Sequence, residues 1–249
     1  MEPFDNLRVL VTGGASGIGL ATANAFRDRG AIVGVLDRSK SGPEGYVYGM
    51  ADVTIDSEVI EAVTGVVSEL GGLDVLVNCA GIGAQGGVQN NTDDEWHLVL
   101  DVNVVGTVRV IRATLPFLLK SSHASIVNVS SIAATVGLPN RALYSASKGA
   151  VLSLTLAMAA DLLRQGVRVN AVNPGTTDTP WVGRLLAVAS DPTAEREALE
   201  ARQPHGRLVS SDEVAEAIVY LSSPLSGSTT GTYLAVDGGM QRLKMSVSK

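Results

Sequence analysis

The chain has 249 residues, a formal net charge of −6 and only 4% aromatic residues. This acidic balance, without a run of lysine and arginine, argues against a nucleic-acid partner, and no apolar run approaches the ~20 residues that span a bilayer. We therefore expect one α/β domain over residues 1–249, with no nucleic-acid and no membrane partner. The N-terminal residues lack a basic and apolar leader, which favours the cytoplasm.

The composition gives no support to metal or disulfide chemistry. Cys79 is the only cysteine, which excludes an intramolecular disulfide and a cysteine cluster. The histidines His97, His123 and His205 lie far apart and without metal-ligand spacing. We therefore predict no metal site.

In chain order, the first predicted elements are a strand, a turn and a helix. Residues 7–12 form a short apolar run that leads into a glycine-rich turn, and residues 20–26 have helical character until Gly30 ends the pattern. Residues 31–37 predict a second buried strand that ends in the carboxylate of Asp37. Together they form one βαβ unit.

The rest of the chain continues this alternation. Further strands are predicted at Leu73–Asn78, Ser125–Ser130, Val167–Asn173 and Tyr233–Val236. Helices are predicted around 55–70, 92–120, 144–165 and 211–222. The pattern predicts a single-domain, doubly wound parallel sheet of the Rossmann kind, covered by helices on both faces.

Residues 179–207 interrupt this rhythm. They contain two helical stretches, Trp181–Leu186 and Thr193–Gln203, between predicted strands. An insertion at this place predicts a small helical lid over a substrate site.

The glycine-rich turn predicts a dinucleotide site. Its glycines let backbone N–H groups and the helix N-terminus approach a pyrophosphate, so we expect contacts from Gly13, Ser16, Gly17, Ile18 and Gly19.

The end of the second strand bears on which cofactor binds. The carboxylate of Asp37 can accept hydrogen bonds from two ribose hydroxyls and repel a 2′-phosphate, which favours NAD over NADP. The adjacent Arg38 could instead pair with such a phosphate, so NADP stays an alternative.

Two residues of the helix predicted at 144–165 suggest proton transfer. Tyr144 and Lys148 lie four residues apart and so share one helix face, where the ammonium would lower the pKa of the phenol from its usual value near ~10. Tyr144 could then act as general acid and base on a substrate oxygen. Ser131, thirteen residues before Tyr144, could hold that oxygen.

These motifs in combination resemble the short-chain dehydrogenase/reductase family over essentially the whole chain. The resemblance implies that Asp52 and Val53 contact adenine and that Asn78, Ala80 and Gly81 lie beside the cofactor. Cys79 departs from the family pattern, in which an asparagine is usual; we interpret it as a small buried filler rather than a nucleophile.

The resemblance also assigns the segment Asn173–Pro180 to the nicotinamide end of the cofactor. Its backbone and threonine hydroxyls would hold the carboxamide, with contacts from Pro174, Gly175, Thr177 and Thr179.

The family's catalytic tetrad maps onto Asn103, Ser131, Tyr144 and Lys148. By resemblance, Tyr144 transfers the proton, Lys148 binds the nicotinamide ribose, Ser131 steadies the substrate oxygen and Asn103 holds a water in the proton relay. Ser130 competes for the serine role, but the interval to Tyr144 favours Ser131 by analogy with the family.

Three arginines bear on the substrate. Arg141 lies three residues before Tyr144, and Arg184 and Arg202 lie in the predicted lid, so their guanidinium groups could bind a carboxylate. The chain is similar to the subgroup of cytosolic 3-hydroxybutyrate and 2-keto-3-deoxy-L-fuconate dehydrogenases, in which arginines at the positions of Arg141 and Arg202 are associated with a substrate carboxylate. Solvated surface arginines are the alternative. Trp181 could form an apolar or sugar-stacking wall, or a packed anchor of the lid.

The leading hypothesis is an NAD-dependent dehydrogenase for a small hydroxy acid or deoxy sugar acid. A neutral aldose dehydrogenase and an acyl-thioester ketoreductase remain alternatives, and a catalytically idle NAD-sensing protein on the same fold is a further one. The resemblance also implies a homotetramer formed through the helices 92–120 and 144–165 and the C-terminal strand region.

Overall fold

A seven-stranded sheet, parallel throughout, lies at the centre of the computed structural model, which describes residues 4–187 and 189–245. Its strand order is β3-β2-β1-β4-β5-β6-β9. These strands are β1 (Arg8–Thr12), β2 (Ile32–Asp37), β3 (Val47–Met50), β4 (Val75–Asn78), β5 (Ser125–Val129), β6 (Arg168–Pro174) and β9 (Tyr233–Val236). The predicted doubly wound sheet is confirmed.

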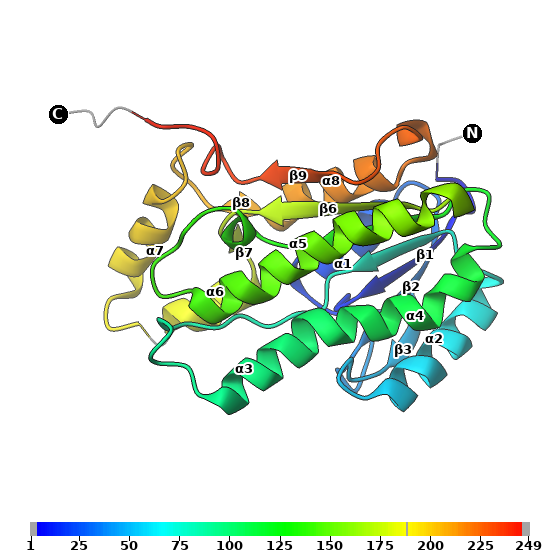
Figure 1. Cartoon of the computed structure of the whole chain (residues 1–249), viewed down its shortest axis with the longest axis horizontal. Coiled ribbons are helices and arrows are strands. Elements are labelled where there is room, and N and C mark those ends of the chain that lie inside the picture. Colours follow the sequence, from blue (N-terminus) through cyan, green and yellow to red (C-terminus); the bar gives the residue numbers. More distant parts are fainter. Residues whose placement is uncertain (1–3, 188, 246–249) are drawn as a thin grey trace.

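Helices cover both faces of this sheet (Figure 1). One face is covered by α1 (Gly17–Arg27) and α8 (Ser211–Ser222), and the other by α2 (Asp56–Leu70), α4 (Gly106–Leu118) and α5 (Ala142–Leu162). The remaining helices are α3 (Asp93–Leu100), α6 (Pro180–Ala187) and α7 (Pro192–Ala201).

Alternation of side chains along each strand produces two cores. In β1, Val9 and Val11 belong to the core under α1 and α8, whereas Leu10 belongs to the core under α2, α4 and α5. The central strands β4 and β5 are buried along their whole length, and such strands are apolar on consecutive residues, a pattern that can be recognised in the sequence.

Local sequence signals fix several helix ends. Thr92 and Glu95 form a capping box at the start of α3, and Ser210 and Glu213 form one at the start of α8. Helix α2 ends at Gly71, which has a φ of 75° that a side chain would strain.

Two features differ from the sequence expectation. The helix predicted at 92–120 is interrupted by a π-helical segment, Asp101–Val105, which separates α3 from α4. Strand β3 was not predicted, because its four residues include Gly49 and show no apolar periodicity. Its edge position and its packing of Gly49 against Val66 of α2 come from tertiary contact.

The segment predicted as a lid contains the expected pair of helices, α6 and α7. Residue 188, between them, lies outside the described residues. A two-stranded parallel sheet of β7 (Thr177–Asp178) and β8 (Val209–Ser210) closes the base of this insertion. The helices are therefore held at both ends by one small sheet.

One helical segment, Ala142–Gln165, is long and apolar enough to cross a membrane, with a mean hydropathy of 1.3 over its most apolar window. In this fold it packs against β5 and β6, although only 33% of that window is buried within the chain. An apolar core helix satisfies the same criterion, so we read α5 as part of the globular domain.

Candidate active site

A cleft of about 810 Å³ lies at the carboxyl ends of the parallel strands. It spans the point between β1 and β4 where the strand order reverses, which is where open α/β sheets bind ligands. All predicted cofactor and substrate residues except Asn78 line it, and so do three of the predicted catalytic residues, Ser131, Tyr144 and Lys148. Asn103 lies behind the wall.

The glycine-rich turn has no room for side chains. A Cβ on Gly13 would lie 2.9 Å from the Cα of Ala80, and one on Gly19 would collide with the backbone of Gly13. Gly13 and Gly17 also have φ values of 64° and 53°. Ser16 precedes α1 without capping it through its side chain, so within the described chain the first N–H groups of the helix stay available to an anion. The turn therefore fits a pyrophosphate.

The carboxylate of Asp37 stands beside this turn at the end of β2. It accepts hydrogen bonds from the backbone N–H of Ala15 at 3.2 Å and of Ser39 at 3.0 Å, and from the Ser39 hydroxyl at 2.8 Å. These donors orient the carboxylate at the wall of the cleft, where it can also accept ribose hydroxyls.

Asp52 lies at the same end of the cleft. Hydrogen bonds from the backbone and the hydroxyl of Thr54 hold the pKa of the Asp52 carboxyl below its usual value, and the charges of Arg38 and Arg109 lower it further. Arg38 also lines the cleft, so the 2′-phosphate alternative retains a candidate cation.

Asn78 does not face the cleft. Its amide donates to Asn128 at 2.9 Å, and the amide of Asn128 donates to the hydroxyl of Thr155 at 2.9 Å. This buried chain ties β4 to β5 and α5, so the sheet retains a polar link although Cys79 replaces the family's asparagine.

Cys79 contributes to the wall of the cleft without being reactive. Burial raises the pKa of its thiol to about 12, despite the nearby positive charge of Lys148. The thiol therefore stays protonated at neutral pH, which agrees with its interpretation as a filler.

Helix α5 places Tyr144 and Lys148 one turn apart on the cleft wall. The Nζ atom of Lys148 lies 5.9 Å from the centre of the Tyr144 ring and donates to the carbonyl of Val129 at 2.9 Å. Lys148 is only 5% exposed and makes no ion pair among the described residues. The ammonium of Lys148 therefore lies beside the Tyr144 ring on the wall of the cleft.

The structure separates the two candidate serines. Ser130 donates its hydroxyl to the carbonyl of Lys148 at 2.8 Å, so its only hydrogen is used. Ser131 accepts from the backbone N–H of Ala133 at 3.1 Å, which leaves its hydroxyl hydrogen free for a substrate oxygen.

The π-helical segment explains where Asn103 points. Its Oδ1 accepts from the backbone N–H of Ile82 at 2.8 Å, and its Nδ2 donates to the carbonyl of Ile82 at 2.9 Å and to the hydroxyl of Ser147 at 3.0 Å. The side chain thus joins the loop after β4 to α5, directly behind Gly81 and Lys148.

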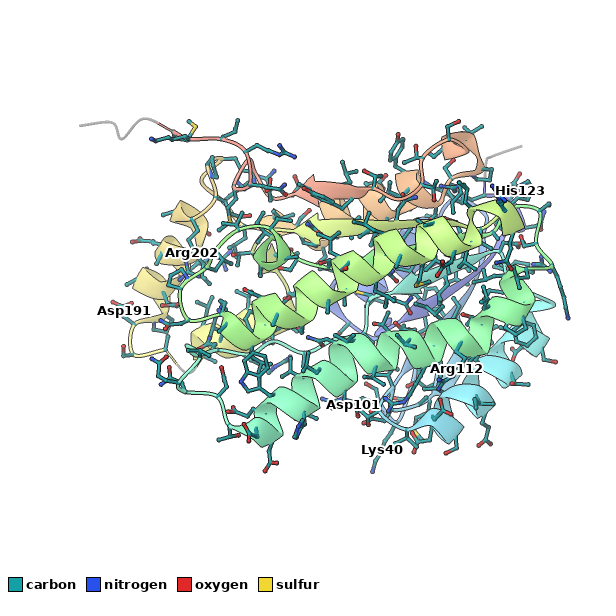
Figure 2. The ribbon with its side chains drawn as sticks, viewed as in Figure 1. Lys40, Asp101, Arg112, His123, Asp191 and Arg202 are labelled. Carbon is teal, nitrogen blue, oxygen red and sulfur yellow. The ribbon has the colours of Figure 1, made fainter. Side chains whose placement is uncertain are left out.

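The opposite end of the cleft is cationic. Arg141 is half-buried; it donates to the carbonyl of Ala84 at 3.0 Å, and its guanidinium lies 5.6 Å from the centre of the Trp181 ring. Burial lowers the pKa of Arg141, and the charge of the neighbouring Arg202 lowers it further. Figure 2 shows Arg202 on the side of α7 that faces the rest of the protein.

None of the three cleft arginines, Arg141, Arg184 and Arg202, forms an ion pair within the part of the chain that the structure describes. Each retains guanidinium donors that a carboxylate could bind.

Sequence reasoning missed parts of this site. The indole of Trp181 lies against Gly83, where a Cβ would be 2.8 Å from the ring, and this glycine two residues after Gly81 was the signal for a close approach. Leu138, Val182 and Leu199 add an apolar wall that only the packing of the lid creates.

Comparison with known proteins assigns the chain to a family. A family model described as enoyl-(acyl carrier protein) reductase matches residues 13–241. The chain is 39% identical to 2-(S)-hydroxypropyl-CoM dehydrogenase 3 of Xanthobacter autotrophicus (93% of this chain, 95% of the relative). It is 37% identical to 2-keto-3-deoxy-L-fuconate dehydrogenase of Xanthomonas campestris pv. campestris (93% of this chain, 79% of the relative).

A solved structure agrees with these relatives. The ligand-free aldohexose dehydrogenase of Thermoplasma acidophilum superposes with a TM-score of 0.92 at 34% identity, covering 99% of this chain and 98% of that one. Sequence and fold together show that the chain belongs to the short-chain dehydrogenase/reductase family, whose members are oxidoreductases acting on CH–OH groups.

Proposed function

We propose that this protein is an NAD-dependent dehydrogenase that interconverts a secondary alcohol and a ketone on a small hydroxy acid or deoxy sugar acid. The carrying observation is the group of three unpaired arginines, Arg141, Arg184 and Arg202, at the end of the cleft that also holds Tyr144. Arg141 is half-buried, Arg184 and Arg202 are exposed, and none of the three forms an ion pair among the described residues. Their guanidinium donors therefore remain available to an anionic ligand, which supports the proposal.

Family membership implies a nicotinamide cofactor, and the lining of the cleft suits NAD. Gly13, Gly17 and Gly19 would admit the pyrophosphate, and Asp37 would bind the adenosine ribose and repel a 2′-phosphate. Gly175 and Thr177 line the opposite end, where they would hold the nicotinamide. When bound, NAD supplies the acceptor for the hydride that leaves the alcohol carbon.

Tyr144 and the residues around it would carry out the proton transfer. In the oxidation, the alcohol O–H donates its proton to the phenolate oxygen of Tyr144, while Ser131 donates a hydrogen bond to the substrate oxygen. The charge of Lys148, whose Nζ atom lies 5.9 Å from the centre of the Tyr144 ring, would assist this proton transfer. Asn103 keeps the loop at Ile82 in place behind this group and would hold a water for proton exchange with solvent.

A neutral sugar is the second candidate substrate. The similarity to an aldohexose dehydrogenase over almost the entire chain supports it, and Trp181 offers a flat apolar surface at the same end of the cleft. Under this alternative the arginines would serve only the packing of the lid.

The experiment that separates these candidates measures NADH formation. Neutral sugars and their corresponding acids would be compared in pairs, with short 3-hydroxy acids added, using NAD and NADP in parallel. Activity confined to the acids with NAD is the expected result. Activity on the neutral sugars alone would contradict the acid assignment, and a preference for NADP would contradict the role of Asp37.

We also propose a homotetramer in the cytoplasm. Leu98 of α3, Val105 of the π-helical segment and Leu156 of α5 are 54%, 42% and 48% exposed, and Figure 1 shows α4 and α5 side by side on the same face. Apolar side chains on this face would be covered by a second copy. Light scattering after size exclusion should give four times the mass of the chain; a monomer would contradict the proposal.

A further inference from the structure

Gln203 is a buried amide at the base of the lid. It directly follows Arg202 and is only 1% exposed, although glutamine is usually found at the surface. Its own backbone closes the last turn after α7, because its N–H donates to the carbonyl of Glu200 at 3.0 Å and its carbonyl accepts from Gly206 at 2.8 Å.

The side chain of Gln203 bridges two segments that are distant in sequence. Its Nε2 donates to the carbonyl of Thr176 at 3.1 Å and to the carbonyl of Arg207 at 2.7 Å. Thr176 belongs to the loop that follows β6 and lines the cleft, whereas Arg207 leads from the lid into β8. Both amide hydrogens are used, so the side chain has one favoured geometry.

The amide oxygen of Gln203 occupies the space beside Gly175. A Cβ on Gly175 would collide with this oxygen, and the oxygen has no hydrogen-bond partner among the described residues. The loop at Gly175 and Thr176 therefore rests directly on the Gln203 side chain. A shift of the Gln203 side chain must displace the loop at Gly175 and Thr176, and a shift of the loop must displace the side chain, because the two are packed without free space between them.

We propose that Gln203 is a positioning residue that couples the lid to the nicotinamide end of the cleft. The inference rests on the proposed function, which assigns the loop at Gly175 to the nicotinamide. Through its backbone Gln203 sets the place of Arg202 at the substrate end, and through its amide it sets the loop at Thr176. Binding at either end then favours the same position of the lid.

The test compares two ligands in the variant Gln203→Met, which keeps the approximate side-chain volume and removes the amide. NADH and ADP-ribose share the adenosine diphosphate part, but only NADH reaches the nicotinamide end. The dissociation constant of NADH, measured by its fluorescence, should rise about tenfold, as expected for the loss of a buried hydrogen-bond network. That of ADP-ribose, measured by calorimetry, should change less than about twofold on the same reasoning.

A matched control removes another buried donor far from the cleft. The hydroxyl of Thr114 donates to the carbonyls of Val110 and Ile111 within α4, so Thr114→Val should leave both dissociation constants unchanged. Equal weakening of NADH and ADP-ribose in Gln203→Met, or no weakening of either, would overturn the coupling. Failure of the unaltered protein to bind either ligand would refute the proposed cofactor use, and with it the premise of the coupling.

A second measurement needs no variant and so decides the question even if Gln203→Met does not fold. Amide hydrogen exchange of the unaltered protein would be followed with NADH and with ADP-ribose. NADH should protect residues 174–178 and residues 202–208 together, whereas ADP-ribose should protect neither segment. Protection by NADH that is confined to residues 174–178 would contradict the coupling.

Discussion

The two ends of the cleft differ in charge and in how their charges are held. At one end, Asp37 and Asp52 are oriented by hydrogen bonds from neighbouring backbone and hydroxyl groups, with Arg38 nearby. At the other end, burial lowers the pKa of the Arg141 guanidinium, and the charge of the neighbouring Arg202 lowers it further. Such repulsion is tolerated where a ligand supplies the missing negative charge.

Other arginines of the lid region show what a structural role looks like in this protein. Arg196 pairs with Asp178 at 3.2 Å and with Glu200 at 3.0 Å, and Arg207 pairs with Glu213 through its two terminal guanidinium nitrogens. The chain has an excess of acidic residues, with a net charge of −6, yet the described arginines facing the cleft have none as partners. This difference between paired and unpaired arginines supports the proposed ligand role of the cleft arginines.

The largest expected effect tests the chemistry between the two ends. Tyr144→Phe removes the proton-transferring hydroxyl and should lower kcat by about 10²- to 10⁴-fold, the usual contribution of a general acid–base. NADH binding, measured by fluorescence titration, should persist because the ring remains. Unchanged turnover would refute the assignment of Tyr144.

The comparison between paired and unpaired arginines is tested next. Arg141→Ala and Arg202→Ala should each raise KM for an acid substrate by about 10- to 100-fold, the expected loss for a charge-assisted hydrogen bond to a carboxylate. Arg196→Ala is the matched control, because Arg196 lies in α7, the helix that ends directly before Arg202, and is paired with acidic residues. Equal effects of Arg196→Ala and Arg202→Ala in steady-state kinetics would remove the distinction.

At the acidic end of the cleft, the preference between NAD and NADP should change when the charge of Asp37 is removed and its side-chain shape is kept. Asp37→Asn should shift the ratio of kcat/KM for NADP over NAD upward by about tenfold, because repulsion of the 2′-phosphate is removed and Arg38 remains. Asp93→Asn, on the exposed first turn of α3, is the control. An unchanged ratio would show that Asp37 does not select the cofactor.

The smallest effect concerns the paired arginine Arg207. Its guanidinium lowers the pKa of Glu213 to about 2, so the pair stabilises the fold above the unfolded pKa of about 4.3 and loses this contribution as pH falls toward about 2. The pair is largely exposed, so Glu213→Gln should lower Tm by about 4 °C or less at pH 7. The difference in Tm from the unaltered protein should narrow below about pH 4.3, and a difference that widens there would contradict this linkage.

Much of the fold could be predicted because its signals are local. Strand β5 lies within the predicted range Ser125–Ser130, since its residues are buried and mostly apolar on consecutive positions. Helix α8 lies at the predicted residues 211–222, since Ser210 with Glu213 marks a helix start. The π-helical segment at Asp101–Val105 could not be predicted, because the side chain of Asn103 is held by Ile82 and Ser147, which are distant in the chain.

The sequence by itself determined the parallel sheet, the glycine-rich turn, the carboxylate at the end of β2 and the pairing of Tyr144 with Lys148, since each depends on spacing within one or two elements. Only the tertiary structure decided that the Ser130 hydroxyl donates to the carbonyl of Lys148 and that the Asn78 amide donates to Asn128 rather than lining the cleft. It alone also placed the Gln203 amide against the loop at Thr176. These outcomes depend on which hydrogen-bond partners packing brings within about 3 Å, and spacing along the chain does not encode that distance.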